Sequence, residues 1–292
     1  MEESLFIDAM SYFDMIYRYN IDYDYNEFYD EDGRVKYELL LKKLQVINLP
    51  DVDSFDYSSL SLKEIIEMLN SVLNKIFGNE FHREFKSFSK KIVPSKDENM
   101  TGSKVLLKRS FNRVVAHKII INADLVSIDV VLLAHEYMHA LLAKYIVNFS
   151  DVVSNIHYDE LISIFIEYIV ANEINKMFRK DKLIRKTNII RLESLKKGSI
   201  DCDRVGNNVP YISDYVRHKL FSYVISDIYA TRLLEIYKED KGIMKKIISI
   251  LKGKDDVDNL REFYNLSLAN NQVVDGFVKK IDFYDKISMN RW

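Results

Sequence analysis

Apolar residues recur at helical spacing along most of the chain. The clearest case begins at Ser61, whose side chain can cap a helix while Glu64 reaches back to it, which is a capping box. Apolar residues then follow three and four positions apart, and Gly78 is suited to end the helix. These apolar residues are Ile65, Met68, Leu69, Val72, Leu73, Ile76 and Phe77. We therefore expect residues 1–100 to form an N-terminal helical region.

The pattern changes between Pro94 and Ser127. Lys104–Arg109 and Val114–Asn122 are short, rich in β-branched residues and partly alternating, which predicts a small antiparallel sheet. Helical periodicity returns at Ser127 and continues to the C-terminus, with expected breaks near Gly198, at 205–210 and at Gly253. No segment reads as a linker, so we expect residues 101–292 to continue the N-terminal region as one domain.

Composition supports a globular, mostly helical protein. Of the 292 residues, 48% are apolar and 29% are charged, and there are only 8 glycines and 3 prolines. So few turn-forming residues argue against an all-β sandwich. Lysine and arginine number 42 against 44 aspartates and glutamates, giving a formal charge of −2. A nucleic-acid partner is not expected, because that balance provides no excess of basic side chains.

Targeting signals are not evident in the sequence. The N-terminus is acidic where a signal peptide would be basic, and no stretch approaches the roughly 20 apolar residues that span a bilayer. A single cysteine, Cys202, excludes an internal disulfide. We expect a cytoplasmic protein without a membrane span.

The segment Ala134–Ala140 contains the pattern His-Glu-x-x-His. Residues four apart share one face of a helix, so His135 and His139 can present imidazole nitrogens to one zinc ion. Glu136 lies about 100° further round the helix, where it can hold and deprotonate a zinc-bound water. This spacing therefore predicts a zinc site with a general base beside it.

A catalytic zinc needs a third protein ligand, and the next predicted helix offers one. That helix runs from about His157 to Met177 and is apolar almost all round, which is typical of a buried helix. Within it Glu160, Ser163 and Glu167 form one polar stripe, and buried carboxylates need cations or hydrogen-bond donors. The candidates for the third ligand are His157, Asp159, Glu160 and Glu167.

Leu132–Ala140 and Asp159–Tyr168 together resemble the zinc metallopeptidases of the thimet oligopeptidase and oligoendopeptidase F family, which are gluzincins. Those enzymes carry an H-E-x-G-H helix, then a helix reading about E-x-x-S-x-x-x-E, whose first glutamate is the third zinc ligand. The resemblance implies that the zinc ligands are His135, His139 and Glu160. It also implies Glu136 as the catalytic base and a supporting carboxylate at Glu167.

A later segment, Tyr215 to Tyr229, is similar to the family's Y-x-Y helix, whose tyrosines stabilise the tetrahedral intermediate. Tyr223 is the best-matched position in that segment. His218 and Tyr215 are alternative donors, and the alignment leaves the choice among the three open. The family also differs from this chain in having a glycine where Met138 stands, and its typical members are longer.

The residues and the resemblance together predict a mainly α fold, a helical zincin-type catalytic domain with a small antiparallel β-sheet next to the active-site helix. The expected function is a zinc-dependent endopeptidase or oligopeptidase acting on peptide or protein substrates. Val114–Asn122 is a candidate edge strand to which a substrate could add. The alternatives are a non-catalytic helical metal-binding or regulatory protein derived from a peptidase, and a hydrolase of other substrates. The presence of Glu136 favours an enzyme, because a structural metal site has no use for it.

Overall fold

Helices make up most of the residues that the structure describes, as the apolar periodicity predicts. This computed structural model describes residues 7–8, 31–51, 57–95, 103–110, 113–122, 125–145, 159–179, 182–206 and 210–289. The strands are β1 (Ile7–Asp8), β2 (Ile92–Ser95), β3 (Ser103–Ser110) and β4 (Arg113–Asn122). The helices are α2 (Glu31–Val46), α3 (Leu62–Phe77), α4 (His82–Ser89), α5 (Ser127–Tyr145), α7 (Asp159–Met177), α8 (Leu183–Gly206), α9 (Pro210–Glu239), α10 (Ile243–Leu251), α11 (Val257–Phe263) and α12 (Asn271–Met289).

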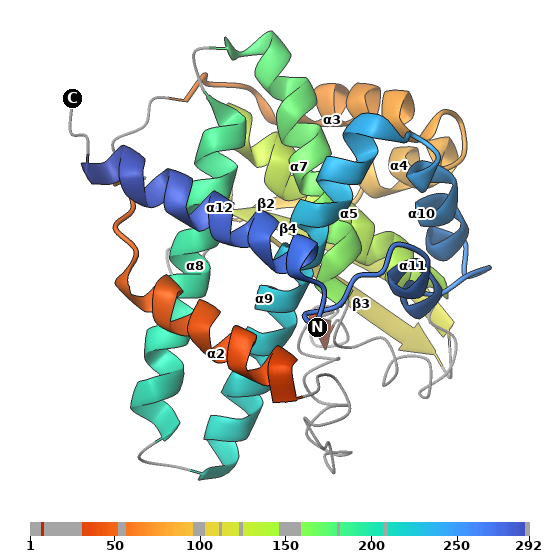
Figure 1. Ribbon diagram of the computed structural model, residues 1–292. Coiled ribbons are helices and arrows are strands. Elements are labelled where there is room, and N and C mark those ends of the chain that lie inside the picture. Colours follow the sequence, from red (N-terminus) through yellow and green to blue (C-terminus); the bar gives the residue numbers. More distant parts are fainter. Residues whose placement is uncertain are drawn as a thin grey trace.

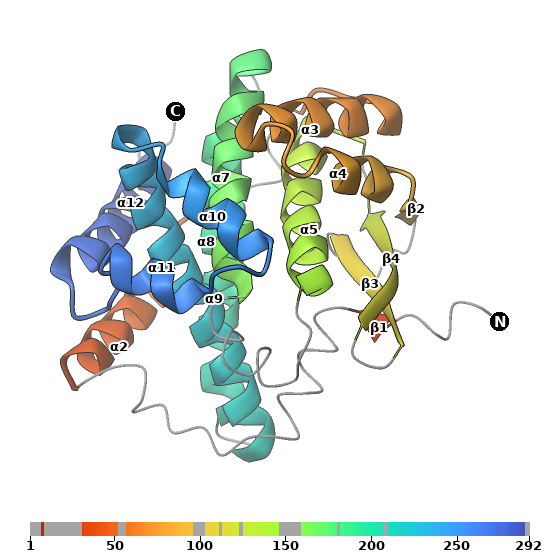
Figure 2. The same cartoon turned by 90° about the vertical axis from the view of Figure 1, so that its right-hand side faces the viewer.

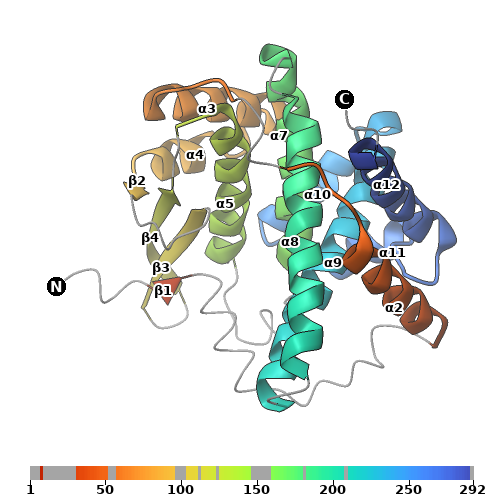
Figure 3. The same cartoon turned by 90° about the vertical axis from the view of Figure 1, so that its left-hand side faces the viewer.

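The helices α5, α7, α8 and α9 stand side by side at the centre of the molecule (Figure 1). The sheet lies against α5, while α3 and α4 lie across one end of α5 and α7 (Figure 2). On the opposite side α2 and α12 pack against α8 and α9 (Figure 3). The pair α5 and α7 is therefore enclosed on both sides, which explains why both helices carry so many buried residues.

The helix α3 has the ends that the sequence predicts. The Glu64 carboxylate accepts a hydrogen bond from the Ser61 backbone N–H at 2.7 Å, and the Ser61 hydroxyl accepts one from the Glu64 N–H at 3.3 Å. The helix ends at Gly78, whose φ of 63° lies in the left-handed region that glycine adopts without strain. The capping box is thereby confirmed. The buried face of α3 packs on α5 and α7.

The sheet differs from the prediction of a purely antiparallel arrangement. Its strand order is β1-β3-β4-β2, with β3 antiparallel to β4 and β2 parallel to β4. The strand β4 is therefore internal where Ile119–Asn122 pairs with β2, and the prediction that it is an edge strand is wrong. The strand β2 lies within residues 1–100, for which a helical region was expected, and it includes Pro94; proline is tolerated there because β2 is an edge strand.

The break expected near Gly198 does not occur, because α8 runs without interruption from Leu183 to Gly206. A Cβ atom at Gly198 would lie 3.0 Å from the Leu220 Cδ1 atom of α9. The glycine thus serves the close approach of α8 and α9 instead of ending a helix. The other two expected breaks are confirmed: α8 ends at Gly206 before α9 begins at Pro210, and Gly253 has a φ of 63° after α10 ends.

Within the described ranges, no helix combines the length and the apolarity that crossing a bilayer requires.

Candidate metal site between two buried helices

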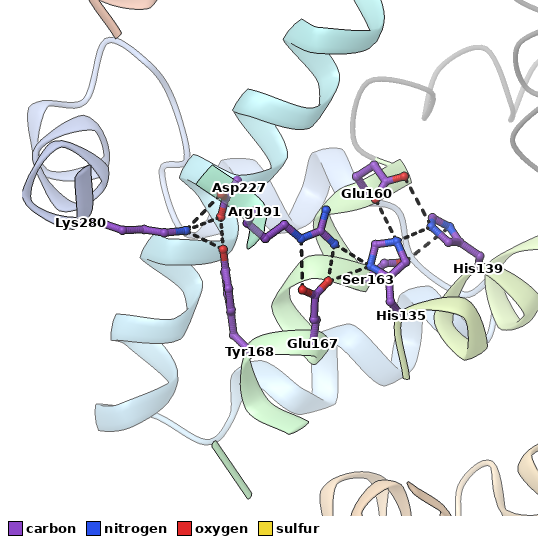
Figure 4. A network of polar contacts seen from close by, with 9 residues as sticks. All are labelled: His135, His139, Glu160, Ser163, Glu167, Tyr168, Arg191, Asp227 and Lys280. Atoms are coloured by element: carbon purple, nitrogen blue, oxygen red, sulfur yellow. Dashed lines mark hydrogen bonds and ion pairs between the residues drawn. The ribbon is translucent and has the colours of Figure 1, made fainter. Parts of the chain in front are cut away.

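The polar stripe of α7 faces the two histidines of α5 (Figure 4). The helix α7 is buried on all sides from Glu160 to Ala171, as its continuous apolar sequence predicts. The carboxylates of Glu160 and Glu167 are only 2% and 3% exposed. The stripe therefore meets the histidines in the protein interior, and it does not face a solvent groove.

His135, His139 and Glu160 converge on one point, and we name these three residues the histidine–glutamate cluster. One potential ligand atom from each residue lies within 4.8 Å of the others. The two imidazole Nε2 atoms are 2.9 Å apart. The Glu160 carboxylate oxygens lie 3.2 Å from the His135 Nε2 atom and 3.5 Å from the His139 Nε2 atom. In the part of the chain that the structure describes, this is the group of side chains that could hold a metal ion.

The spacing of these atoms fits a tetrahedral zinc site. Zinc lies about 2.0–2.2 Å from nitrogen and oxygen ligands, so two ligand atoms of a tetrahedron are roughly 3.3–3.6 Å apart. The observed separations of 2.9–3.5 Å are close to that edge length. In addition, the buried Glu160 Oε2 atom has no hydrogen-bond partner among the described residues. A cation satisfies such an atom, so the residues fit a metal ion.

The opposite nitrogens of the two imidazoles contact α7. The His135 Nδ1 atom lies 3.1 Å from a Glu167 carboxylate oxygen, and the His139 Nδ1 atom lies 3.5 Å from the Ser163 hydroxyl. When Nδ1 donates its proton to these acceptors, each Nε2 carries a lone pair toward Glu160. His135 is therefore placed between the two glutamates of the stripe, with one ring nitrogen facing each.

Arg191, on α8, belongs to the same network and was not anticipated from the sequence. Its Nε atom donates to Glu167 Oε1 at 3.1 Å, and its Nη2 atom donates to Glu167 Oε2. Burial alone would raise the pKa of Glu167, but Arg191 and His135 outweigh that effect and lower it to about 2. A charged residue within the apolar run Ile189–Leu192 was the signal that could have identified it.

The electrostatics of the cluster itself follow from burial and close charges. Burial would raise the pKa of Glu160, but the charges of His139 and His135 hold that pKa well below its usual range. Burial would lower the pKa of His135, yet Glu160 and Glu167 raise it above its ordinary value. The carboxylates are therefore ionised at neutral pH, as metal binding by oxygen ligands requires.

A second buried polar group lies one residue further along α7, and we name it the lysine–aspartate–tyrosine cluster. The Lys280 ammonium of α12 donates to the Tyr168 hydroxyl at 2.6 Å and to the Asp227 carboxylate of α9 at 2.9 and 3.1 Å. Tyr168 also donates to Asp227 (Figure 4). Burial and the charge of Asp227 raise the pKa of Tyr168 well above its usual range, so it stays protonated.

The other predicted site residues are only partly placed. Glu136 follows His135 on α5 and is 9% exposed. Tyr223 is half-buried on α9 and packs against the hydrophobic core. His218 and Tyr215 belong to the backbone of α9, but their side chains lie outside the described residues, as does the side chain of Asp159. His157 lies outside the described residues altogether.

Comparison with known proteins identifies a similar fold. The structure resembles the crystal structure of a protein assigned as an oligoendopeptidase F from Bacillus anthracis str. Ames, with a TM-score of 0.63 and 13% sequence identity. The match covers 94% of this chain and 59% of that chain, so this chain is considerably shorter than its structural neighbour. At this identity the likeness concerns the fold alone. No family model and no curated protein matches the sequence.

Proposed function

We propose that this chain is a zinc-dependent peptidase that hydrolyses peptide bonds, with its catalytic region in residues 101–292. The observation that carries the proposal is the convergence of His135, His139 and Glu160 on one point, with Glu136 next to His135 in the sequence of α5. Two histidines and one carboxylate are the ligand set of a zinc site that keeps its fourth position for water or substrate. The likeness to a protein assigned as an oligoendopeptidase F supports peptides as the substrate class.

Under this proposal the imidazole Nε2 atoms and a Glu160 carboxylate oxygen hold the metal. A bound zinc ion supplies a Lewis acid, which polarises the scissile carbonyl and lowers the pKa of water toward neutrality. The Glu136 carboxylate accepts the proton of the attacking water and then passes it to the leaving amine. The apolar surroundings of α5 strengthen these electrostatic interactions, because they exclude the solvent that would screen them.

The remaining residues orient these groups and stabilise developing charge. Glu167 lies 3.1 Å from His135 Nδ1, and when it accepts the proton of that nitrogen it fixes the orientation of the ring. We propose the Tyr223 hydroxyl as the donor to the oxyanion of the tetrahedral intermediate, with His218 and Tyr215 of the same helix as the alternatives.

The test measures zinc content and peptide hydrolysis together. The protein purified without chelators should carry close to one zinc per chain, cleave a quenched fluorescent peptide library, and lose this activity when a chelator removes the metal. Glu136→Gln should keep the zinc while kcat falls by about 10²–10⁴-fold, because its role is proton transfer and not coordination.

Glu173→Gln is the matched control. Glu173 is a glutamate of α7 that pairs with Lys75 and Lys176 on the surface, so its replacement should leave kcat unchanged. Zinc binding without any cleavage would instead favour a metal-binding or regulatory protein. Cleavage at the wild-type rate by Glu136→Gln would contradict the proposed base.

A further inference from the structure

We infer that Arg191 is a positioning residue of the metal site: its guanidinium holds the Glu167 carboxylate against His135 Nδ1, and so directs the Nε2 lone pair of His135 to the metal. The inference rests on the metal site of the proposed function, but it does not depend on peptide hydrolysis. Arg191 does not touch the point on which His135, His139 and Glu160 converge; it acts through Glu167.

The guanidinium of Arg191 contacts both oxygens of Glu167. Its Nε atom donates to Oε1 at 3.1 Å while its Nη2 atom donates to Oε2, which is a two-point contact between a planar donor and a planar acceptor. The side chain of Arg191 is 16% exposed and that of Glu167 is 3% exposed. Such a fork fixes the rotation of the carboxylate as well as its position, and an ammonium group cannot do the same.

Two groups contact the His135 Nδ1 atom, and they favour opposite positions of the ring proton. This oxygen lies 3.1 Å from the His135 Nδ1 atom, and the Arg191 Nη2 atom lies 2.9 Å from the same nitrogen. If Nδ1 donates to Glu167, Nε2 is left as a lone pair facing Glu160 and His139. If Nδ1 accepted from Arg191 instead, the ring proton would sit on Nε2 and block coordination. The Glu167 carboxylate held by the fork offers Nδ1 an acceptor for its proton, and a metal ion that takes the Nε2 lone pair selects this first arrangement.

The next residue of α7 offers an internal comparison. Tyr168 is as deeply buried as Glu167, and its hydroxyl binds Asp227 and Lys280, two residues that do not contact either histidine among the described hydrogen bonds. Loss of this hydroxyl removes buried hydrogen bonds of α7, as a change at Arg191 does, and should likewise lower stability. It does not, however, remove a contact to His135. Comparing the two substitutions therefore separates the loss of a contact to His135 from a general loss of stability.

The experiment measures zinc affinity of folded protein by competition with a chromogenic chelator. The variants are Arg191→Lys, the double variant Arg191→Met with Glu167→Gln, and the control Tyr168→Phe. Arg191→Lys and the double variant should bind zinc about 10–100-fold more weakly, the usual effect of losing a partner that orients a histidine ligand. Tyr168→Phe should lower the midpoint of thermal unfolding and leave zinc affinity within about twofold, because it leaves every contact of His135 in place.

Nitrogen-15 NMR of the zinc-loaded wild type gives a second readout that needs no variant to fold. A slowly exchanging Nδ1 proton on His135, with coordination through Nε2, supports the inference. Coordination through Nδ1 overturns it, and so does wild-type zinc affinity in both Arg191 variants. A wild type that takes up no zinc overturns the metal site itself and with it the proposed function. Zinc-dependent peptide cleavage with unchanged affinity in the variants overturns only the role of Arg191.

Discussion

Two buried polar clusters meet at consecutive residues of α7, and they differ in how completely their groups are paired. In the lysine–aspartate–tyrosine cluster every charge has a partner, since Lys280 binds Tyr168 and both oxygens of Asp227. In the histidine–glutamate cluster two ring nitrogens face one another at 2.9 Å, and Glu160 Oε2 has no hydrogen-bond partner among the residues that the structure describes. The first cluster is closed by the protein alone, whereas the second could hold a cation at its centre.

The comparison shows that burial of charge is not by itself a sign of function. Asp227 is 1% exposed and Glu160 is 2% exposed, so burial does not distinguish them. What distinguishes them is the supply of donors: Asp227 faces an ammonium and a hydroxyl, while Glu160 faces two imidazoles whose other nitrogens already contact α7. A buried group of side chains in which hydrogen-bond acceptors outnumber donors is therefore the better candidate for a metal site.

The largest expected effect is on zinc binding, and it separates the two glutamates of α7. Glu160→Ala should lose most of the zinc because it removes a direct ligand. Glu167→Ala should retain the metal with about 10–100-fold weaker affinity, because only the orientation of His135 is lost. Zinc affinity measured on both purified variants decides between them. If Glu167→Ala lost the metal and Glu160→Ala kept it, the assignment of the two roles would be reversed.

The next largest effect is on stability, and it belongs to the closed cluster. Lys280→Met leaves the Asp227 carboxylate buried without its ammonium partner, so the free energy of unfolding should fall by about 3–5 kcal/mol. Combining it with Asp227→Asn should recover most of that loss, because no charge then stays buried. The exposed neighbour Lys279 on the same helix is the control, and Lys279→Met should change stability little.

Urea unfolding in the presence of a chelator measures these changes without a contribution from metal. Zinc affinity of folded Lys280→Met should equal that of the wild type. A parallel loss of zinc affinity and stability in this variant would mean that the two clusters act as one unit, and the comparison between them would fail.

The smallest of the three effects concerns α9, which carries Asp227 of the lysine–aspartate–tyrosine cluster and the proposed oxyanion donor Tyr223. Tyr223 lies four residues before Asp227, so the two side chains leave the same face of this helix. Tyr223→Phe should lower kcat by about 10²–10³-fold, the usual cost of one oxyanion donor, while KM changes far less. Tyr237 is a half-buried tyrosine of the same helix, and Tyr237→Phe should leave kcat unchanged. Steady-state kinetics on a peptide that the wild type cleaves would show whether Tyr223 is the donor to the oxyanion. A normal kcat for Tyr223→Phe would favour His218 or Tyr215 instead.

Features that depend on neighbouring residues in the chain were predictable. The capping box of Ser61 and Glu64 appears as expected, because both partners lie within one turn. The uninterrupted course of α8 through Gly198 was not predictable in the same way: glycine weakens a helix locally, but here it lets α8 approach Leu220 of α9 closely. The parallel pairing of β2 with β4 was missed for a similar reason, since its register joins segments far apart in the sequence.

The sequence by itself determined which residues share a face on each helix, because helical periodicity depends only on the chain's own geometry. It placed His135 with His139 on one helix, and Glu160 with Glu167 on another, and it indicated that both helices are apolar. The rotation and axial offset of the packed helices were set by tertiary structure. That packing brought Glu160 to the Nε2 atoms, Glu167 to Nδ1 of His135 and Arg191 to Glu167, because contacts between helices depend on how their side chains fit together and not on spacing within either one.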